Sequence, residues 1–233
     1  ADVAGTRGLD NPDSDHGTNV AMVAAAARDS LGIVGMAYNA IVAMFRADTV
    51  GTCATKDAND PKSGCKLADS AIAQGIDRAV TAGAKVINLS LGGSSPSTAV
   101  RLAIARAARA NVVVVVAAGN DGNSTETGVD PNNPDPFATG LRQAGSGNVI
   151  IAGSVDSANA ISAFSNRAGT EATWYLSARG EKVCCVYDNG VLKITTDESG
   201  QRFQYVFSGT SFAAPQIAGA AALLIQAFPN LTA

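Results

Sequence analysis

The chain has 233 residues, of which 46% are hydrophobic and 16% are charged, and its formal net charge is −3 at pH 7. This apolar fraction is too high, and the net charge too small, for a disordered chain, and the length suits one large domain better than two. The sequence pI near 5.1 argues against nucleic acid as the main partner, because phosphate binding requires clustered Lys and Arg side chains.

The first half of the chain alternates predicted helices and strands. The segment HGTNVAMVAAAAR, which starts at His16, has small and apolar residues on all sides, as a buried helix has. Residues 41–47 form a short apolar run typical of a strand, and residues 67–82 show helical spacing that ends at Gly83. We expect a strand over residues 85–91 and a helix over residues 97–110 to follow.

The second half of the chain opens with five consecutive valines at 112–116, which predict a strand that is buried on both faces. Residues 121–147 are polar and rich in Asn, Pro and Gly, so we expect a long loop, followed by another buried strand at 148–155. Residues 174–207 contain β-rich segments with a hairpin turn predicted at Asn189-Gly190. A helix is expected over about residues 210–228.

Alternating strands and helices predict an α/β fold in which helices cover both faces of a mostly parallel sheet. No internal repeat and no linker interrupts the pattern, so residues 1–233 are expected to form a single domain. Ligands of such folds bind beyond the carboxyl ends of the strands. No run approaches the roughly 18 apolar residues of a membrane span, so none is expected.

The four cysteines fall into two pairs. Cys53 and Cys65 bracket a polar segment, and a disulfide closing that loop would imply an oxidising compartment; reduced thiols in a cytosolic protein are the alternative. Cys184 and Cys185 are adjacent, and strand alternation would point their side chains to opposite faces, so we expect no bond between them. The pairs lack metal-ligand spacing and the chain has one His, so no metal site is assigned.

Three short segments place polar residues where the fold gains nothing from them. His16 opens a helix, and Asn120 follows the valine strand. Ser211 lies at the N-terminus of the last helix in the segment SGTSFAAP, whose Pro215 fits a first helical turn. Separately, these are ordinary capping and turn residues. Together, on one rim of a parallel sheet, they supply the nucleophile, base and oxyanion donor that acyl transfer by a serine requires.

These segments resemble those of the subtilisin-like serine proteases, the subtilases. HGTNVA is similar to their His motif, VINLSLGG to their substrate-binding strand, VVVVVAAGNDG to their oxyanion strand, and SGTSFAAPQIAGAAALL to their Ser motif. AISAFSNRAG is similar to the family's segment before the Ser region. The resemblance implies a three-layer αβα fold with a mostly parallel sheet.

The resemblance also implies roles for individual residues. Ser211 would attack the peptide carbonyl, His16 would be the general base, and the Asn120 side chain with the Ser211 backbone N–H would hold the oxyanion. The residues implied to bind substrate are Ser90, Leu91, Gly92, Gly93, Ala117, Ala118 and Gly119. Because these are small and uncharged, we expect a roomy apolar pocket with a broad preference rather than one that selects Arg or Lys.

The match fails at the family's third catalytic group, an Asp that ends a strand well before the His. Asp2, Asp10, Asp13 and Asp15 lie in polar sequence, and none is assigned to that role. We therefore expect a subtilase catalytic domain that is truncated at both ends and lacks the strand with the catalytic Asp and the C-terminal end of the domain. We expect this loss to impair the activity of the chain alone. The β segment before Ser211 is longer than in the family and predicts a hairpin near the site.

HGTN, SNRAG and SGTSFAAP are most similar to the subtilase passenger domains of bacterial autotransporters, which implies a secreted or cell-surface protein. The expected partners are polypeptide substrates and a propeptide or parent-chain segments. No cofactor is required, although the loop over residues 121–135 could supply oxygen ligands to a structural calcium ion; an ordinary solvated loop is the alternative.

Two other functions are alternatives to a peptidase. A catalytically impaired subtilase-like domain could be a binding or scaffold module, against which stands the retention of His16, Asn120 and Ser211. An α/β-hydrolase esterase would need a G-x-S-x-G motif and a His that follows the Ser, and both features are contradicted by the sequence.

Overall fold

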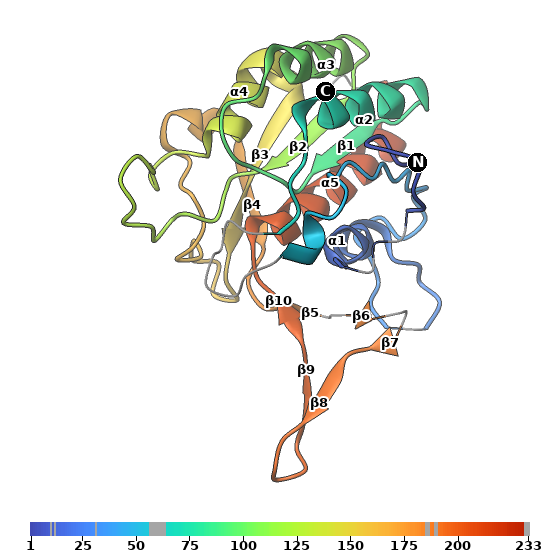
Figure 1. Ribbon diagram of the computed structural model, residues 1–233, viewed down its shortest axis with the longest axis vertical. Helices are drawn as coiled ribbons and strands as arrows, with labels where there is room; N and C mark the ends of the chain where they lie inside the picture. The colour runs from blue at the N-terminus through green and yellow to red at the C-terminus, as the bar shows by residue number, and fades with distance from the viewer. Residues whose placement is uncertain are drawn as a thin grey trace.

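The central element is a parallel sheet of four strands in the order β1-β2-β3-β4 (Figure 1). The computed structural model describes residues 1–9, 11, 13–30, 32–55, 64–184, 187–188 and 191–230. The strands are β1 (Val86–Leu89), β2 (Val113–Ala117), β3 (Val149–Val155) and β4 (Tyr175–Arg179). Every residue of β2 is buried, which confirms the interpretation of the valine run as a strand covered on both faces.

Helices cover both faces of the sheet (Figure 1). One face carries α2 (Asp69–Thr81), α3 (Thr98–Arg109) and α4 (Pro136–Gly145), and the other carries α1 (His16–Ala25) and α5 (Thr210–Ala227). Alternate valines of β2 divide between the two core layers, because successive side chains of a strand point to opposite faces. The predicted three-layer α/β fold is therefore confirmed.

The strand predicted at residues 41–47 is wrong. Only Arg46 pairs there, through an isolated parallel bridge to Asp2, with the Val3 amide donating to the Arg46 carbonyl at 2.8 Å. The pairing ends because the only partner in the described residues is the N-terminal segment, which turns away after Val3 to form bends. Apolar side chains of this segment that a sheet would bury are therefore exposed to solvent, and Ile41 is 98% exposed.

The prediction of an unbroken loop over residues 121–147 is also wrong, because α4 lies within it. Asp135 caps this helix by accepting from the Ala138 amide, and Pro136 occupies the first turn, where its missing N–H costs nothing. Phe137 and Leu141 then anchor the helix in the core. Short 3-10 segments occur at Cys53–Thr55, Ser146–Asn148 and Gly169–Trp174.

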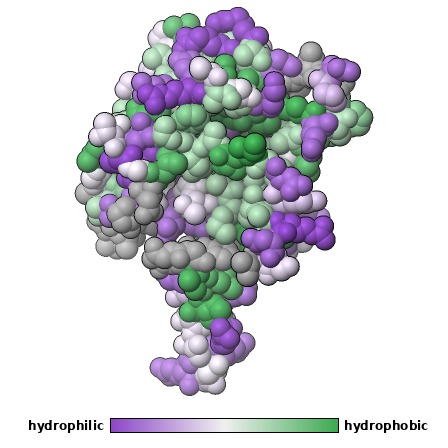
Figure 2. Space-filling model, turned by 90° about the vertical axis from the view of Figure 1, so that its right-hand side faces the viewer, coloured by the Kyte–Doolittle hydropathy of each residue, from purple (hydrophilic) through white to green (hydrophobic). Residues whose placement is uncertain are grey.

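The β-rich segment before α5 projects from the body as an extended hairpin (Figures 1 and 2), as the long insertion predicted. Its antiparallel pairs are β5 (Val183–Cys184) with β10 (Val206–Phe207), β6 (Tyr187–Asp188) with β7 (Val191–Leu192), and β8 (Ile194–Thr196) with β9 (Arg202–Gln204). Figure 2 shows hydrophobic side chains near its base and hydrophilic ones toward its tip. The predicted turn residues Asn189 and Gly190 lie outside the described residues.

A disulfide joins Cys53 to Cys65, as the sequence predicted. The prediction for Cys184 and Cys185 involves a residue outside the described part of the chain; Cys184 itself is disulfide-bonded rather than a free thiol. Within the described ranges, no helix has the length and apolar character needed to cross a membrane.

Candidate functional site

Ser211 and Ser90 are held together where the end of β1 meets the start of α5. The Ser90 hydroxyl donates to the Ser211 carbonyl at 2.7 Å, and the Ser211 hydroxyl lies 3.5 Å from the Ser90 carbonyl. Asn88 donates to the Ser90 hydroxyl at 2.9 Å and orients it. The predicted nucleophile is thus fixed against the predicted substrate-binding strand.

Pro215 explains why the Ser211 carbonyl is open to this bond. Helix α5 begins at Thr210, so Pro215 lies past the first turn, contrary to the sequence-based expectation. A proline cannot donate to the carbonyl four residues before it, which here is that of Ser211. The Ser90 hydroxyl occupies the acceptor that the helix leaves unused.

Asn120 is anchored to the start of the same helix. Its side-chain oxygen Oδ1 accepts from the Thr210 amide at 2.8 Å and from the Thr210 hydroxyl at 3.0 Å. These bonds satisfy one of the amides left unpaired at the N-terminus of α5. With Oδ1 engaged, Nδ2 is the end of Asn120 that can donate a hydrogen bond.

The loop that carries Asn120 is held by Asn166, which sequence reasoning assigned no role. Asn166 is 2% exposed; its Oδ1 accepts from the Asp121 amide at 2.7 Å, and its Nδ2 donates to the Asn133 carbonyl at 2.9 Å. Gly119 has a φ of +106°, and a Cβ there would come within 2.9 Å of Asn166 Oδ1. The SNRAG segment was the available signal, since Asn166 is its Asn.

His16 is the first residue of α1 and reaches the site through an aromatic contact. Its ring packs edge-on against Phe212 at 5.7 Å between centroids, and Phe212 stacks on Phe207 at 4.6 Å. Because Phe212 directly follows Ser211, the fold brings the imidazole of α1 to the helix start that carries the predicted nucleophile.

A cavity of about 210 Å³ opens beside Ser211. Its lining contains Ser211, Thr210 and Asn120, the predicted residues Leu91, Gly92, Gly93, Ala117 and Gly119, and two acidic residues, Asp121 and Asp135. Ala118 is fully buried in the core and is absent from the lining, although it was predicted to bind substrate. The predicted substrate-binding residues are uncharged, but the cavity lining adds two carboxylates to them.

Asp135 is the buried charge of this cavity. The residue is 7% exposed, and its carboxylate accepts from the Ala138 amide at 2.8 Å and from the Gly93 amide at 3.1 Å. Burial raises the pKa of Asp135 to about 6, and the nearby charge of Asp121 adds to the increase. A Cβ on Gly92 would collide with Oδ2 of Asp135, so this strand end requires glycine.

The acidic residues near the N-terminus make other contacts. Asp2 forms an ion pair with Arg7 at 2.9 Å, and its hydrogen bond to that guanidinium holds the pKa of Asp2 well below its usual range. Arg7 and Arg46 both pair with Asp48 at 2.8 Å. Asp15 sits at the N-cap of α1 without a side-chain capping bond. Asp10 lies outside the described residues.

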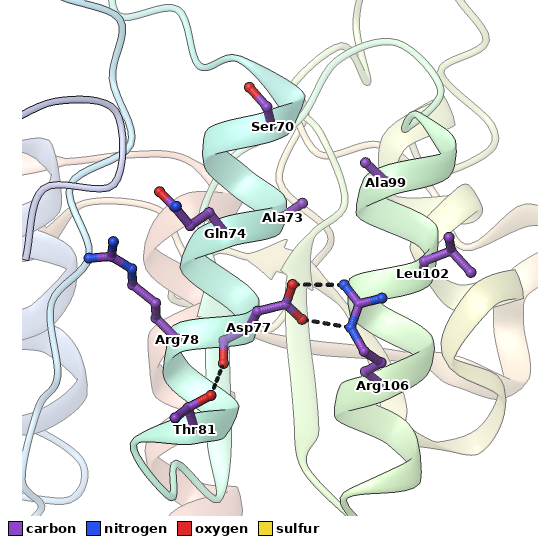
Figure 3. Close-up of a pocket in the computed structure, with 9 residues that line it drawn as sticks. All are labelled: Ser70, Ala73, Gln74, Asp77, Arg78, Thr81, Ala99, Leu102 and Arg106. Atoms are coloured by element: carbon purple, nitrogen blue, oxygen red, sulfur yellow. Dashed lines mark hydrogen bonds and ion pairs between the residues drawn. The ribbon is translucent and has the colours of Figure 1, made fainter.

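A second, wider hollow of about 640 Å³ lies between α2 and α3 (Figure 3). Asp77 and Arg106 meet across it through two hydrogen bonds of 2.7 and 2.8 Å. Both side chains are more than 40% exposed, and the other lining residues are polar or small helix-surface residues together with Leu102. We assign no activity to this hollow.

Among the described residues, no three His, Cys, Asp or Glu side chains converge to hold a metal ion. In the loop over residues 121–135, Asp130 accepts from the Asn132 amide at 3.0 Å and from the Asn133 side chain at 2.6 Å. Its carboxylate is thus used within the loop.

The chain matches the model of the subtilase family over residues 2–233. It is 35% identical to Subtilisin DY of Bacillus licheniformis over 218 residues, which make up 94% of this chain and 66% of that relative. It is 32% identical to Subtilisin E of Bacillus subtilis (strain 168) over 220 residues, which make up 94% of this chain and 48% of that relative. The chain therefore spans less than two thirds of the length of these curated relatives.

Solved structures show the same fold. A protease from Pseudoalteromonas arctica PAMC 21717 superposes with a TM-score of 0.62 at 29% identity, covering 94% of this chain and 60% of that chain. The S218A mutant of the protease domain of PatA superposes with a TM-score of 0.65 at 24% identity, covering 96% of this chain and 69% of that chain.

Proposed function

Since the chain belongs to the subtilase family, we propose that it is the catalytic part of a serine endopeptidase that forms an acyl-enzyme on Ser211. His16 is the general base in this proposal, and the Asn120 side chain with the Ser211 backbone N–H forms the oxyanion hole. The substrates are polypeptides that pair with Ser90–Gly93 as an added strand.

The observation that carries the proposal is the anchoring of Asn120 beside Ser211. Two bonds from Thr210 fix the Asn120 oxygen, so the amide donor is held in place before substrate arrives. A donor fixed in advance needs no reorganisation when negative charge develops, which is why such groups stabilise a transition state strongly. The N-terminus of the 18-residue helix α5 adds a favourable field at Ser211.

His16 transfers a proton at each change of bonding in the proposed reaction. The Ser211 oxygen attacks the peptide carbonyl as its proton passes to His16, and the tetrahedral oxyanion lies against the Asn120 amide. His16 then gives that proton to the leaving amine as the C–N bond breaks. Water then attacks the acyl-enzyme carbonyl as its proton passes to His16. His16 returns the proton to the Ser211 oxygen as the ester bond breaks, so the acid product leaves and the Ser211 hydroxyl is restored.

The carboxylate that orients His16 is proposed to come from a part of the protein N-terminal to residue 1. Asp2 and Asp48 are committed to Arg7 and Arg46, which leaves them poorly suited to hold an imidazole. The wider context is likewise a proposal: a secreted or cell-surface protein, in the manner of autotransporter passenger domains, with a propeptide or parent-chain segments as partners. The Cys53–Cys65 disulfide supports export.

A fluorophosphonate probe tests the proposal, because it labels only an activated serine. We expect label on Ser211, mapped by mass spectrometry, in the domain expressed with its upstream sequence, and none in the matched variant Ser211→Ala. A folded wild-type domain that stays unlabelled would favour the alternative, a subtilase-like binding or scaffold module.

A further inference from the structure

The cavity beside Ser211 carries negative charge and no positive charge among its described lining residues. Asp121 and Asp135 are the two charged side chains in that lining, and no Lys, Arg or His of the described ranges is part of it. The remaining lining residues are small or polar, apart from Leu91. A substrate side chain that enters this space therefore meets a buried carboxylate.

We propose that Asp135 is a specificity-determining residue, whose carboxylate selects a Lys or Arg side chain in the substrate residue just before the cleaved bond. The inference rests on the proposed peptidase function and narrows its substrate class. It replaces the broad apolar preference expected from the sequence.

The geometry leaves the carboxylate able to bind a cation. Oδ1 accepts the Ala138 N–H and Oδ2 accepts the Gly93 N–H, and the Phe137 backbone N–H also lowers the pKa of this carboxylate. A carboxylate has about four lone-pair sites, so it can accept a further donor. The same two bonds fix the orientation of the carboxylate, so little side-chain entropy is lost when a ligand arrives.

The wall of the cavity also suits a long basic side chain. Oδ2 of Asp135 lies against Gly92, in the space that a Cβ on that residue would fill, so the glycine admits the carboxylate into the wall of the cavity. Leu91 and Ala117 offer apolar surface to the methylene stem of a Lys or Arg, whose charged end would lie at the carboxylate.

Charge balance favours a cation over an apolar group. Asp135 is 7% exposed and lies within the field of Asp121, so an apolar substrate would cover a carboxylate without compensating it. A cationic side chain would neutralise that charge in a place poorly screened by water. We expect a preference of about 10- to 100-fold, in the range measured for partly buried charge pairs at interfaces.

A purely structural role is the competing explanation, since Asp135 also caps α4. Asn caps helices about as well as Asp, so Asp135→Asn removes the charge while keeping the cap. The matched control is Asp77→Asn, which removes a carboxylate on the opposite side of α3 from α4, remote from the cavity lining.

The experiment compares two peptides that differ only in the residue before the cleaved bond, Arg or norleucine. The domain is expressed with its upstream sequence. Hydrolysis by the wild type and both variants gives a kcat/KM ratio, and binding to Ser211→Ala, with and without Asp135→Asn, gives a Kd ratio by calorimetry. We expect Arg to be favoured at least about tenfold in both ratios, Asp135→Asn to bring them near one, and Asp77→Asn to leave them unchanged.

The outcomes separate this inference from the proposed function. If the wild type cleaves both peptides equally, or if Asp135→Asn slows both by the same factor, Asp135 does not select the substrate and the peptidase proposal stands. If neither peptide is cleaved but the Arg peptide still binds Ser211→Ala more tightly through Asp135, the peptidase proposal fails and the selective site remains. Equal binding without cleavage overturns both.

Discussion

The raised pKa of Asp135 makes the stability of the protein depend on pH in a direction that can be calculated. Its pKa rises from 3.8 to about 6 on folding, mainly because the residue is buried. The folded protein therefore holds this proton more tightly than the unfolded chain does. The resulting stabilisation is full below pH 3.8 and is lost as the pH rises through about 6.

The size of this effect follows from the shift. Each pKa unit is worth about 1.4 kcal/mol, so a shift of about two units corresponds to about 3 kcal/mol in total. Between pH 4.5 and pH 7.5, where the domain can be studied away from strong acid, about 2 kcal/mol of it should be lost. Asp135→Asn cannot titrate and loses none of it.

Urea unfolding of the wild type and Asp135→Asn at a series of pH values measures the effect. Asn presents an N–H where Oδ2 accepts from the Gly93 amide, so the variant starts with a constant penalty that does not depend on pH. Asp2 and Asp197, whose pKa values are lowered by hydrogen bonds from Arg7 and Ser199, affect both proteins alike and cancel in the difference. Parallel stability curves for the two proteins would refute the reasoning.

Three other substitutions test the site and its scaffold. Asn120→Ala should lower kcat by about 10²- to 10³-fold with little change in KM, the magnitude typical of removing one oxyanion-hole donor. Steady-state kinetics measure both constants, and a loss confined to KM would contradict an oxyanion role. Leu141→Ala should lower the free energy of unfolding, measured with urea, by about 3 kcal/mol, because Leu141 is fully buried between α4 and the sheet. A loss below about 1 kcal/mol would contradict that packing. Asp77→Ala should lower the free energy of unfolding by less than about 1 kcal/mol, because the Asp77–Arg106 pair is exposed. A larger loss in the same measurement would contradict a minor role for this pair.

Elements whose signal is local could be predicted from the sequence, whereas elements that depend on distant partners could not. The valine strand, α2, α3 and α5 could be predicted because hydrophobic spacing along a segment records which of its faces are buried. Residues 41–47 looked equally like a strand, but a strand also needs a neighbour, and only Arg46 finds one among the described residues. Helix α4 was missed because the polar residues before it dominate the composition of its surroundings, while its start signal is only Asp135-Pro136.

The sequence by itself determined the fold class and named Ser211, His16 and Asn120 as candidates, because short motifs place a few polar residues at the ends of predictable elements. Only the tertiary structure decided that Ser90 bonds to the carbonyl that Pro215 leaves free, and that Asn120 is fixed by Thr210. It alone decided that Asp135 lies in the cavity of Ser211 rather than in a solvated loop. These contacts join residues far apart in the chain, and their energies come from burial and hydrogen-bond geometry that no local pattern records.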